Sequence, residues 1–369
     1  MNQMRAVIFL DSASSAKSER PLMLRPVLLH PILSWVGGKL RAYGVERFFV
    51  VCGPEFAREA RACFPADLEV CVSAGGEELE TFLAEEGTVA VIPGPVLPVS
   101  GGLEMEENRA FTAPAAELRC GAVPADPESL PGFVSVADLR EAREVSFLCR
   151  DDTAERLLDG GVEILDPDSV YIGPWATVGE GSVILPGTIL RGDTRIGRDC
   201  EIGPDAMIRD CRIGDGTTVN ASQLNESEVG CRVSVGPFAY VRPNCHIGDD
   251  IKVGDFVEVK NSTIGNGTKI SHLTYVGDSD VGRKVNFGCG TVTTNYDGFK
   301  KHRCTIGDRA FLGCNTNLVA PVTVGEGAYT AAGSTITEDV PADALAVARN
   351  RQKNLEGWAE RNRKLHGEH

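Results

Sequence analysis

Apolar branched residues recur at every sixth position through the second half of the chain. These positions are Ile172, Val178, Ile184, Leu190, Ile196, Ile202 and Ile208; after a shift of one residue, Ile213 and Val219; in a new phase, Val229, Val235, Val241, Ile247, Val253 and Val259; and last, Ile306, Leu312, Leu318, Val324 and Ile336, with Thr330 as an exception. A strict six-residue period is the signature of hexapeptide repeats. The pattern therefore predicts a left-handed parallel β-helix.

Three hexapeptides close one triangular coil of such a fold, and each aliphatic side chain points inward onto its equivalent one coil away. Glycine frequently follows the aliphatic residue, as in Ile172-Gly173, Ile196-Gly197, Ile202-Gly203 and Val324-Gly325. We expect these glycines and other small residues to turn the corners of the coil with positive φ. Coils stack at strand spacing, so about ten coils predict a prism about 48 Å tall.

The first half of the chain instead alternates strand-like and helix-like runs. Strands are predicted at residues 5–10, 47–51, 68–72 and 88–92, and helices at 31–43 and 54–63. Such alternation is typical of a small α/β domain with a parallel sheet. Residues 101–135 have the Gly-, Pro- and Glu-rich composition of loops.

A helix is predicted over residues 138–159, where leucines recur and Gly160-Gly161 ends the run. The expected organisation has four parts. These are an α/β domain at 1–135, a helical connector at 136–160, the β-helix at 161–340, and a C-terminal arm at 341–369 in which residues 354–365 form a short helix.

Composition and charge narrow the class of protein. The 369 residues include 41 glycines and only 6% aromatics, which argues against a helical bundle. The net charge of −15 argues against nucleic acid as a partner, because phosphate binding needs a basic face. The apolar run at 6–10 is too short for a signal peptide or membrane span. Twelve cysteines without a CxxC pair or regular spacing argue against disulfides or zinc and favour a reducing cytoplasm.

Residues 234–298 contain the segments RP, GDFVEVK, HLTYVGD and NYDG in a fixed order and spacing. This stretch resembles the acetyltransferase core of the bacterial bifunctional N-acetylglucosamine-1-phosphate uridyltransferase/glucosamine-1-phosphate acetyltransferases, whose motifs read RP…GNFVExK…HLxYxGD…NxGxGTxxxNYDG. Residues 152–168 (DTAERLLDGGVEILDPD) are similar to the connector of that family, and 341–358 (PADALAVARNRQKNLEGW) to its terminal arm.

The N-terminal half departs from that family. The family's phosphate loop, AAGxGTRMxxxxPK, is replaced at residues 11–17 by DSASSAK, which has no glycine, so the backbone cannot easily form the amide nest that a triphosphate needs. In the family's GDxP segment, here 94–98, Pro95 stands where an aspartate binds magnesium. No base-reading QxxGTAHA motif is recognisable near 73–77, and the domain has about half the expected length. We interpret it as a degenerate domain with a structural or docking role; surviving sugar-nucleotide binding and residual uridyl transfer are the alternatives.

The resemblance assigns His272 as the general base. The acceptor amine must lose a proton to attack a thioester, and an imidazole, with an ordinary pKa near 6.5, accepts a proton at neutral pH. By the same resemblance Glu258 orients or charge-stabilises His272, although a solvated glutamate is the alternative. Asn295 or a nearby backbone amide is expected to stabilise the oxyanion of the tetrahedral intermediate.

The resemblance also implies the two binding surfaces. Arg242, Lys260 and Lys301 match the cations that bind the sugar phosphate, with Lys300 as an alternative to Lys301; Arg supplies a planar fork and Lys a point charge. Tyr275 and Asn286 match residues that hydrogen-bond the sugar. The residues that match contacts to acetyl-CoA are Cys289, Asn295, Tyr296, Cys314, Ala332 and Arg349.

Two of these positions differ from the family, which usually has Ala at position 289 and Ser at 314. Backbone contacts would tolerate the changes, whereas loss of a required Ser hydroxyl would weaken acetyl-CoA binding. A cysteine nucleophile that forms an acetyl-enzyme is an alternative, but no paired base is evident in the sequence.

These features together predict a cytoplasmic enzyme that transfers the acetyl group of acetyl-CoA to the amine of glucosamine-1-phosphate or a close amino-sugar phosphate. The resemblance implies a homotrimer with sites between prisms. No metal is expected, and the net charge and the short apolar run argue against nucleic-acid and membrane partners. A non-catalytic β-helix that binds a sugar nucleotide and a residual sugar-1-phosphate nucleotidyltransferase are the competing hypotheses.

Overall fold

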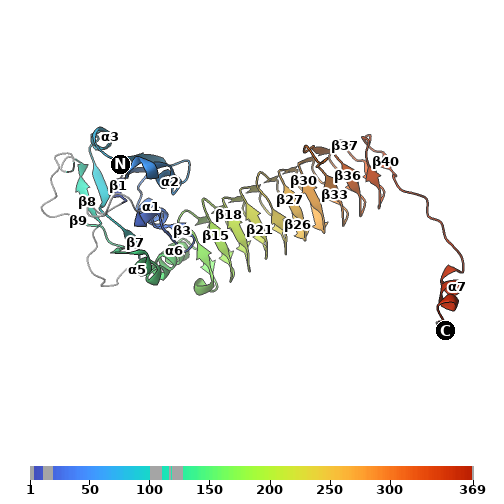
Figure 1. Ribbon diagram of the computed structural model, residues 1–369, viewed down its shortest axis with the longest axis horizontal. Helices are drawn as coiled ribbons and strands as arrows, with labels where there is room; N and C mark the ends of the chain where they lie inside the picture. Colours follow the sequence, from blue (N-terminus) through green and yellow to red (C-terminus); the bar gives the residue numbers. More distant parts are fainter. Residues whose placement is uncertain (1–3, 11–19, 100–109, 116–117, 119–127, 368–369) are drawn as a thin grey trace.

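A six-stranded sheet forms the centre of the N-terminal domain in the computed structural model, which describes residues 4–10, 20–99, 110–115, 118 and 128–367 (Figure 1). In spatial order its strands are β5 (Glu69–Ser73), β4 (Arg47–Val51), β1 (Arg5–Phe9), β6 (Thr88–Ile92), β8 (Phe111–Pro114) and β9 (Glu128–Ser129). The first four are parallel, as predicted, and β8 and β9 are antiparallel additions at one edge.

Helices and short strands surround this sheet. They are η1 (Leu22–Leu24), β2 (Pro26–Val27), β3 (His30–Pro31), α1 (Ile32–Ala42), η2 (Pro54–Phe56), α2 (Ala57–Arg61), α3 (Glu77–Phe82), β7 (Val96–Pro98), β10 (Phe133–Ser135), α5 (Leu139–Glu144) and α6 (Phe147–Asp159). The glycine-free segment 11–17 lies outside the described residues. The segment with Pro95 leads into β7, which pairs antiparallel with β10 and is buried.

Two sequence predictions for this half of the chain are wrong in detail. Residues 101–135 are not loop throughout, because their described part contains β8, β9 and β10. The expected single helix over 138–159 is two helices. Asp138 caps the start of α5 by accepting hydrogen bonds from the backbone N–H groups of Arg140 and Glu141 at 2.8 and 2.9 Å. The helical conformation is interrupted at residues 145–146, before α6 begins.

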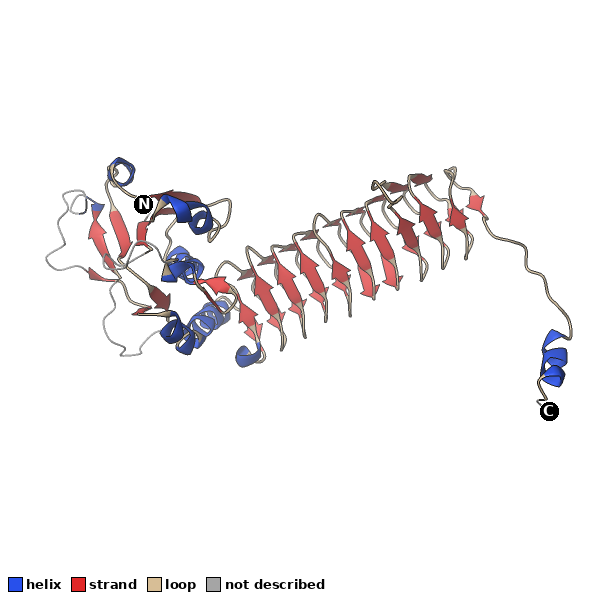
Figure 2. Ribbon diagram, viewed as in Figure 1, coloured by secondary structure: helices blue, strands red, loops and turns tan. Residues whose placement is uncertain are grey.

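The second half is a left-handed β-helix of three parallel sheets, which we name the first, second and third face (Figure 2). The first face holds β11 (Glu163–Ile164), β14 (Val183–Ile184), β17 (Glu201–Ile202), β20 (Thr218–Val219), β23 (Ser234–Val235), β26 (Lys252–Asp255), β29 (Lys269–His272), β32 (Asn286–Phe287), β35 (Phe311–Leu312), β38 (Tyr329–Thr330) and β40 (Leu345–Ala346).

The 3-10 turn η3 (Pro167–Ser169) leads from the first face to the second in the first coil. The second face holds β12 (Tyr171–Ile172), β15 (Ile189–Arg191), β18 (Met207–Arg209), β21 (Gln223–Asn225), β24 (Tyr240–Val241), β27 (Glu258–Lys260), β30 (Tyr275–Gly277), β33 (Val292–Thr294), β36 (Asn317–Val319) and β39 (Thr335–Ile336). The third face holds β13 (Thr177–Val178), β16 (Arg195–Ile196), β19 (Arg212–Ile213), β22 (Glu228–Val229), β25 (His246–Ile247), β28 (Thr263–Ile264), β31 (Ser279–Val281), β34 (Cys304–Ile306) and β37 (Val322–Val324).

The six-residue period coincides with the core of this prism. Its aliphatic members belong to one continuous hydrophobic cluster, with Val178 partly buried at the end of the prism. The exception, Thr330, is also buried, and its hydroxyl satisfies the Gly313 N–H at 3.0 Å and contacts the Thr316 hydroxyl at 3.0 Å. A threonine is tolerated inside because both of its polar partners are buried with it.

The corners of the coils differ from the prediction. Gly203 has φ of 110°, but Gly173, Gly197 and Gly325 do not have positive φ. Many corners are turned by other residues in the left-handed region, such as Asp199 at 54°. Most of the glycines that follow an aliphatic residue are instead required by close approach, because an added Cβ would lie against the backbone of the next coil.

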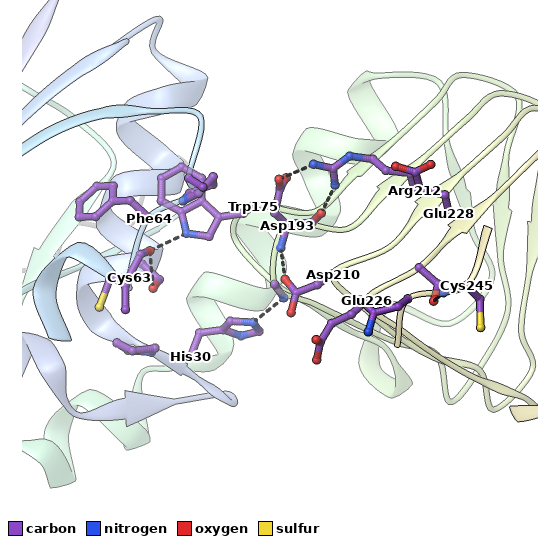
Figure 3. Close-up of a pocket in the computed structure, with 18 of the residues that line it drawn as sticks. His30, Cys63, Phe64, Trp175, Asp193, Asp210, Arg212, Glu226, Glu228 and Cys245 are labelled. Carbon is purple, nitrogen blue, oxygen red and sulfur yellow. Dashed lines mark hydrogen bonds and ion pairs between the residues drawn. The ribbon is translucent and has the colours of Figure 1, made fainter. Parts of the chain in front are cut away.

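The N-terminal domain packs against the first coils of the prism (Figure 3). Trp175 donates from its indole Nε1 to the Cys63 carbonyl at 2.8 Å, and its ring packs on Phe64 with centroids 5.6 Å apart. Arg195 pairs with Asp67 at 2.8 Å. A cavity of about 600 Å³ remains between the two parts. At the other end, the chain leaves β40 and ends in α7 (Trp358–Leu365), which lies well away from the prism (Figure 1).

We expect the contact between the domains to weaken at acidic pH. His30 Nδ1 contacts the Leu28 carbonyl at 3.1 Å, and Nε2 accepts from the Gly192 N–H at 3.4 Å, an arrangement that requires a neutral ring. Burial lowers the pKa of His30, and Arg191 adds to this while Asp210 opposes it. His30 therefore binds a proton more tightly when the N-terminal domain is released from the prism than when it is docked. The docked state accordingly loses stability as pH falls from about 6.5 towards the lowered pKa of His30.

Hydrogen exchange of residues 62–66 at pH 7.5 and 5.5 measures this effect. After correction for the intrinsic exchange rate, which itself falls with pH, lower protection of these amides is expected at pH 5.5 in the natural protein, and a smaller change in His30→Gln. An equal change in both proteins would contradict a role for His30.

Candidate functional site

One corner of the prism brings together residues that are far apart in the sequence. Five residues occupy the same position in successive coils, where the first face turns into the second, and we name them the corner column: Asp255, His272, Cys289, Cys314 and Ala332. Asp255 pairs with His272 in strand register. Each member is followed by a residue with positive φ, which makes the turn.

Close backbone contacts continue the corner column upward. The Asn315 N–H donates to the Cys289 carbonyl at 2.8 Å, and the Gly333 N–H donates to the Cys314 carbonyl at 2.8 Å. Above them, a Cβ built on Gly333 would lie 3.8 Å from Cδ of Arg349. His272, the expected base, therefore lies beneath Cys289, Cys314 and Ala332 in the corner column, and Arg349 lies beside its upper end.

His272 has a carboxylate partner, but not the expected one. Its Nδ1 lies 2.6 Å from Asp255 Oδ1, and this hydrogen bond lowers the pKa of Asp255. Glu258 lies on the second face, where its Oε1 accepts from Arg242 at 2.8 Å. The expectation that Glu258 orients His272 is thus corrected, since the strand register that places Glu258 beside Tyr275 places Asp255 beside His272.

Asp255 is the residue that the sequence reasoning missed. The family motif GNFVExK has an asparagine at the position of Asp255, so the acidic replacement was a signal present in the sequence. The motif alone did not single out Asp255, because Glu258 already matched the carboxylate that the motif contains.

The three expected phosphate-binding cations interact with one another. Lys260 is the largest cause of a lowered pKa at Lys301, and Arg242 lowers it further. Because Lys301 is the member of this pair with the lowered pKa, its proximity leaves the proton on Lys260 and raises the pKa of Lys260, and the Asp278 carboxylate, 3.3 Å from Lys260 Nζ, raises it further. Like charges gathered in this way favour a bound anion, because they repel one another without it. Lys301, and not Lys300, is the lysine that shifts the pKa of Lys260.

The buried carboxylate of Asp278 supports the group of three cations. Burial raises the pKa of Asp278, but hydrogen bonds from Asn261, Asn295 and Lys260 outweigh burial and lower it overall. The Asn295 amide donates to the Asp278 carboxylate and to the Tyr275 hydroxyl, the latter at 3.4 Å. These two contacts hold Tyr275 and Asp278 in place, and the role of Asn295 or a backbone amide as oxyanion donor stays a prediction.

The two expected sugar contacts flank the corner column. Tyr275 begins β30 on the second face, three residues after His272, and Asn286 begins β32 on the first face, three residues before Cys289. Both side chains are partly buried. They therefore border the column from its two sides.

The six-residue period is interrupted by a compact loop at residues 295–303. Asp297 accepts from the backbone N–H groups of Phe299 and Lys300 at 2.7 and 2.6 Å and pairs with His302 at 2.7 Å. The Lys300 contact is the largest cause that lowers the pKa of Asp297 to about 2. Tyr296 is 58% exposed, and its backbone bridges to Lys301. This loop thus presents Tyr296 and Lys301 to solvent.

The thiols of the column have no activating partner here. Cys289 is half-buried and Cys314 is exposed, and neither thiol is hydrogen-bonded within the part of the chain that the structure describes. A nucleophilic cysteine needs a base within hydrogen-bond reach. Cys289 and Cys314 therefore lack the base that a cysteine nucleophile needs among the described residues.

Among the described residues, no group of three or more His, Cys, Asp or Glu side chains is placed to hold a metal ion. None of the helices in the same residues combines the length and apolar character that crossing a bilayer requires.

Comparison with known proteins finds similarity to one family and to several curated proteins. The family described as "Bacterial transferase hexapeptide (six repeats)" matches residues 226–261 and 303–338. "Bifunctional protein GlmU" of Geobacillus sp. (strain WCH70) is 50% identical over 228 residues, which cover 62% of this chain and 50% of that protein. GlmU of Caldanaerobacter subterraneus subsp. tengcongensis is 52% identical over 242 residues, or 66% and 52% of the two chains. The β-helix of this chain is therefore similar to part of the GlmU proteins.

The chain spans about half the length of the GlmU proteins it matches. Among solved structures, Arabidopsis UDP-N-acetylglucosamine acyltransferase aligns with 55% of this chain and 71% of its own, at 18% identity and a TM-score of 0.39.

Proposed function

We propose that this protein is an acetyl-CoA-dependent N-acetyltransferase that acts on glucosamine-1-phosphate or a closely related amino-sugar phosphate. The corner column carries the proposal, because it places a carboxylate-paired histidine beneath Cys289, Cys314, Ala332 and Arg349. Three cations that interact with one another lie on the adjoining face and loop. The GlmU similarity over the β-helix supports the same reaction.

The chemistry follows from these placements. Arg242, Lys260 and Lys301 bind the phosphate, and Tyr275 and Asn286 contact the sugar ring. His272 takes the proton from the amine with Nε2 as the amine attacks the thioester carbonyl. The new N–C bond forms, the C–S bond breaks, and the thiolate of coenzyme A takes up a proton.

The residues of the column fit a slender thioester arm. Cys289, Cys314 and Ala332 are small, and glycine follows two of them, so few side-chain atoms stand above His272 along the column. Arg349 at the upper end supplies a cation suited to a phosphate group.

We further propose that the enzyme is a cytoplasmic homotrimer, as the family resemblance implies, and that its N-terminal domain has a docking role without uridyltransferase activity.

Acetylation assays test the function directly. We expect acetyl-CoA-dependent N-acetylation of glucosamine-1-phosphate, with glucosamine itself a poorer substrate. No acetylation of any amino-sugar phosphate would overturn the proposal. Pyrophosphate release with UTP and magnesium would instead support residual nucleotidyl transfer, and sugar-nucleotide binding without turnover would support the regulatory alternative.

The cations make a separate prediction. Lys260→Met is expected to raise KM for glucosamine-1-phosphate roughly 10- to 100-fold, since it removes one charge-assisted hydrogen bond to the phosphate. KM for acetyl-CoA should stay the same. Lys284→Met removes the same charge at another corner and serves as the control, and equal effects of both variants would contradict a phosphate site at Lys260.

A further inference from the structure

We propose that Asp255 is the positioning residue of His272, holding Nδ1–H on its carboxylate so that Nε2 is the nitrogen that receives the proton of the acceptor amine. The kinetic part of this proposal rests on the proposed acetyltransferase function, whereas the contact itself does not. Asp255 acts through His272.

The backbone brings these two side chains together. β26 and β29 are four residues long, whereas the other described strands of the first face have two, so the strand pairing continues to the corner and aligns Asp255 with His272. Gly254 makes this extension possible, because a Cβ there would lie 2.0 Å from the Ser271 carbonyl oxygen. The Leu273 N–H also donates to the Asp255 carbonyl at 3.0 Å.

The contact determines the tautomer of the ring. A neutral imidazole has one donor and one acceptor nitrogen, and a carboxylate only accepts. The 2.6 Å contact between Asp255 Oδ1 and His272 Nδ1 therefore puts the proton on Nδ1 and leaves the Nε2 lone pair free. Positive charge that develops on the ring during proton transfer then lies beside a negative charge.

Asp255 is ionised when this chemistry takes place. The hydrogen bond from His272 is the largest cause that lowers its pKa, and the positive charges of His272 and Lys252 lower it further. No catalytic partner other than Asp255 contacts the His272 ring among the described residues, and Glu258 is engaged by Arg242.

This partner distinguishes the chain from its family motif. An asparagine at this position accepts the same hydrogen bond without a charge, so this chain adds a negative charge to the base. The substitution of Asn by Asp implies a charged dyad in this enzyme, where the motif provides a neutral pair.

Two variants of Asp255 separate the hydrogen bond from the charge. Asp255→Asn keeps an acceptor for Nδ1–H and is expected to lower kcat about 2- to 5-fold, the size typical of an exposed ion pair. Asp255→Ala removes both and is expected to lower kcat about 10-fold or more. KM for both substrates should change less than 2-fold, roughly, because neither variant removes a contact to substrate.

Ring-nitrogen NMR gives a readout that does not depend on activity. The ¹⁵N shifts of His272 should show the Nδ1–H tautomer in the natural protein and in Asp255→Asn, and a mixture of tautomers in Asp255→Ala. Glu228→Gln, which removes the carboxylate 3.1 Å from His246 on the third face, is the matched control and should alter neither the His272 shifts nor kcat.

The outcomes distinguish the two proposals. An unchanged tautomer and unchanged kcat in Asp255→Ala would overturn the positioning role. A tautomer change in Glu258→Gln instead would assign that role to Glu258. A tautomer that depends on Asp255 in a protein without acetyltransferase activity would support the contact and reject the proposed function alone.

Discussion

Replacing His272 with alanine is expected to lower kcat for acetyl transfer about 10²–10⁴-fold, the contribution typical of a general base. The amine of the acceptor then has no group to receive its proton as it attacks the thioester. KM for both substrates should change little, since the phosphate and coenzyme contacts come from other residues. Steady-state assays with glucosamine-1-phosphate and acetyl-CoA measure both constants.

His246→Ala is the matched control for this variant. His246 is also an exposed histidine with a carboxylate neighbour, Glu228, at 3.1 Å, but it lies on the third face, away from the corner column. Its removal should leave kcat unchanged. Comparable losses in both variants would show that His272→Ala acts through stability, and full activity of His272→Ala would exclude it as the base.

Gly265→Val is expected to destabilise the β-helix by about 3 kcal/mol, which corresponds to a fall of roughly 6–10 °C in Tm. An added Cβ at Gly265 would lie 2.6 Å from the Gly282 carbonyl carbon and 2.8 Å from the Arg283 nitrogen. Both are backbone atoms of the next coil, so relief requires the coils to separate and the inward stack of aliphatic side chains to loosen. Thermal unfolding followed by circular dichroism measures the change.

Gly216→Asn provides the comparison. Gly216 turns a corner with φ of 66°, and the nearest atom to an added Cβ is the Cγ of Arg232 at 3.5 Å, an ordinary contact. Asparagine already takes this conformation at Asn244. A change within about 1 kcal/mol is expected, because asparagine tolerates the left-handed region. If Gly216→Asn were the more damaging variant, the regular spacing of glycine in the repeats of this chain would be explained by positive φ rather than by close approach of the next coil.

The spacing of apolar residues was enough to predict the β-helix. A period of six that returns an aliphatic residue to each face of a triangular coil allows one core, and that core is present from Ile172 to Ile336. The motifs around His272 likewise identified most of the candidate site, because residue type and spacing along the chain survive in a fold whose coils stack in sequence order.

Several features depended on contacts that spacing does not encode. The break between α5 and α6 falls at Val145 and Ser146, where the sequence has neither the glycine nor the proline that would mark it. Of the described strands between residues 101 and 135, β8 pairs with β6 and β10 pairs with β7, both partners distant in sequence, and β9 pairs with β8. Glycine is needed after many of the aliphatic residues because the backbone of the next coil approaches closely. That backbone lies about one coil further along the chain, so the local sequence does not reveal the contact.

By itself the sequence determined the prism, its aliphatic core and the identity of His272, Lys260 and the other motif residues, because these follow from a repeat and from residue type. Only the tertiary structure decided which of them meet. Strand register between β26 and β29 pairs Asp255 with His272 and leaves Glu258 to Arg242, since a difference of three residues in the chain moves a carboxylate across the corner to another face. The stacking of coils then lines up Cys289, Cys314 and Ala332 above the base, although 60 positions separate His272 from Ala332 in the chain.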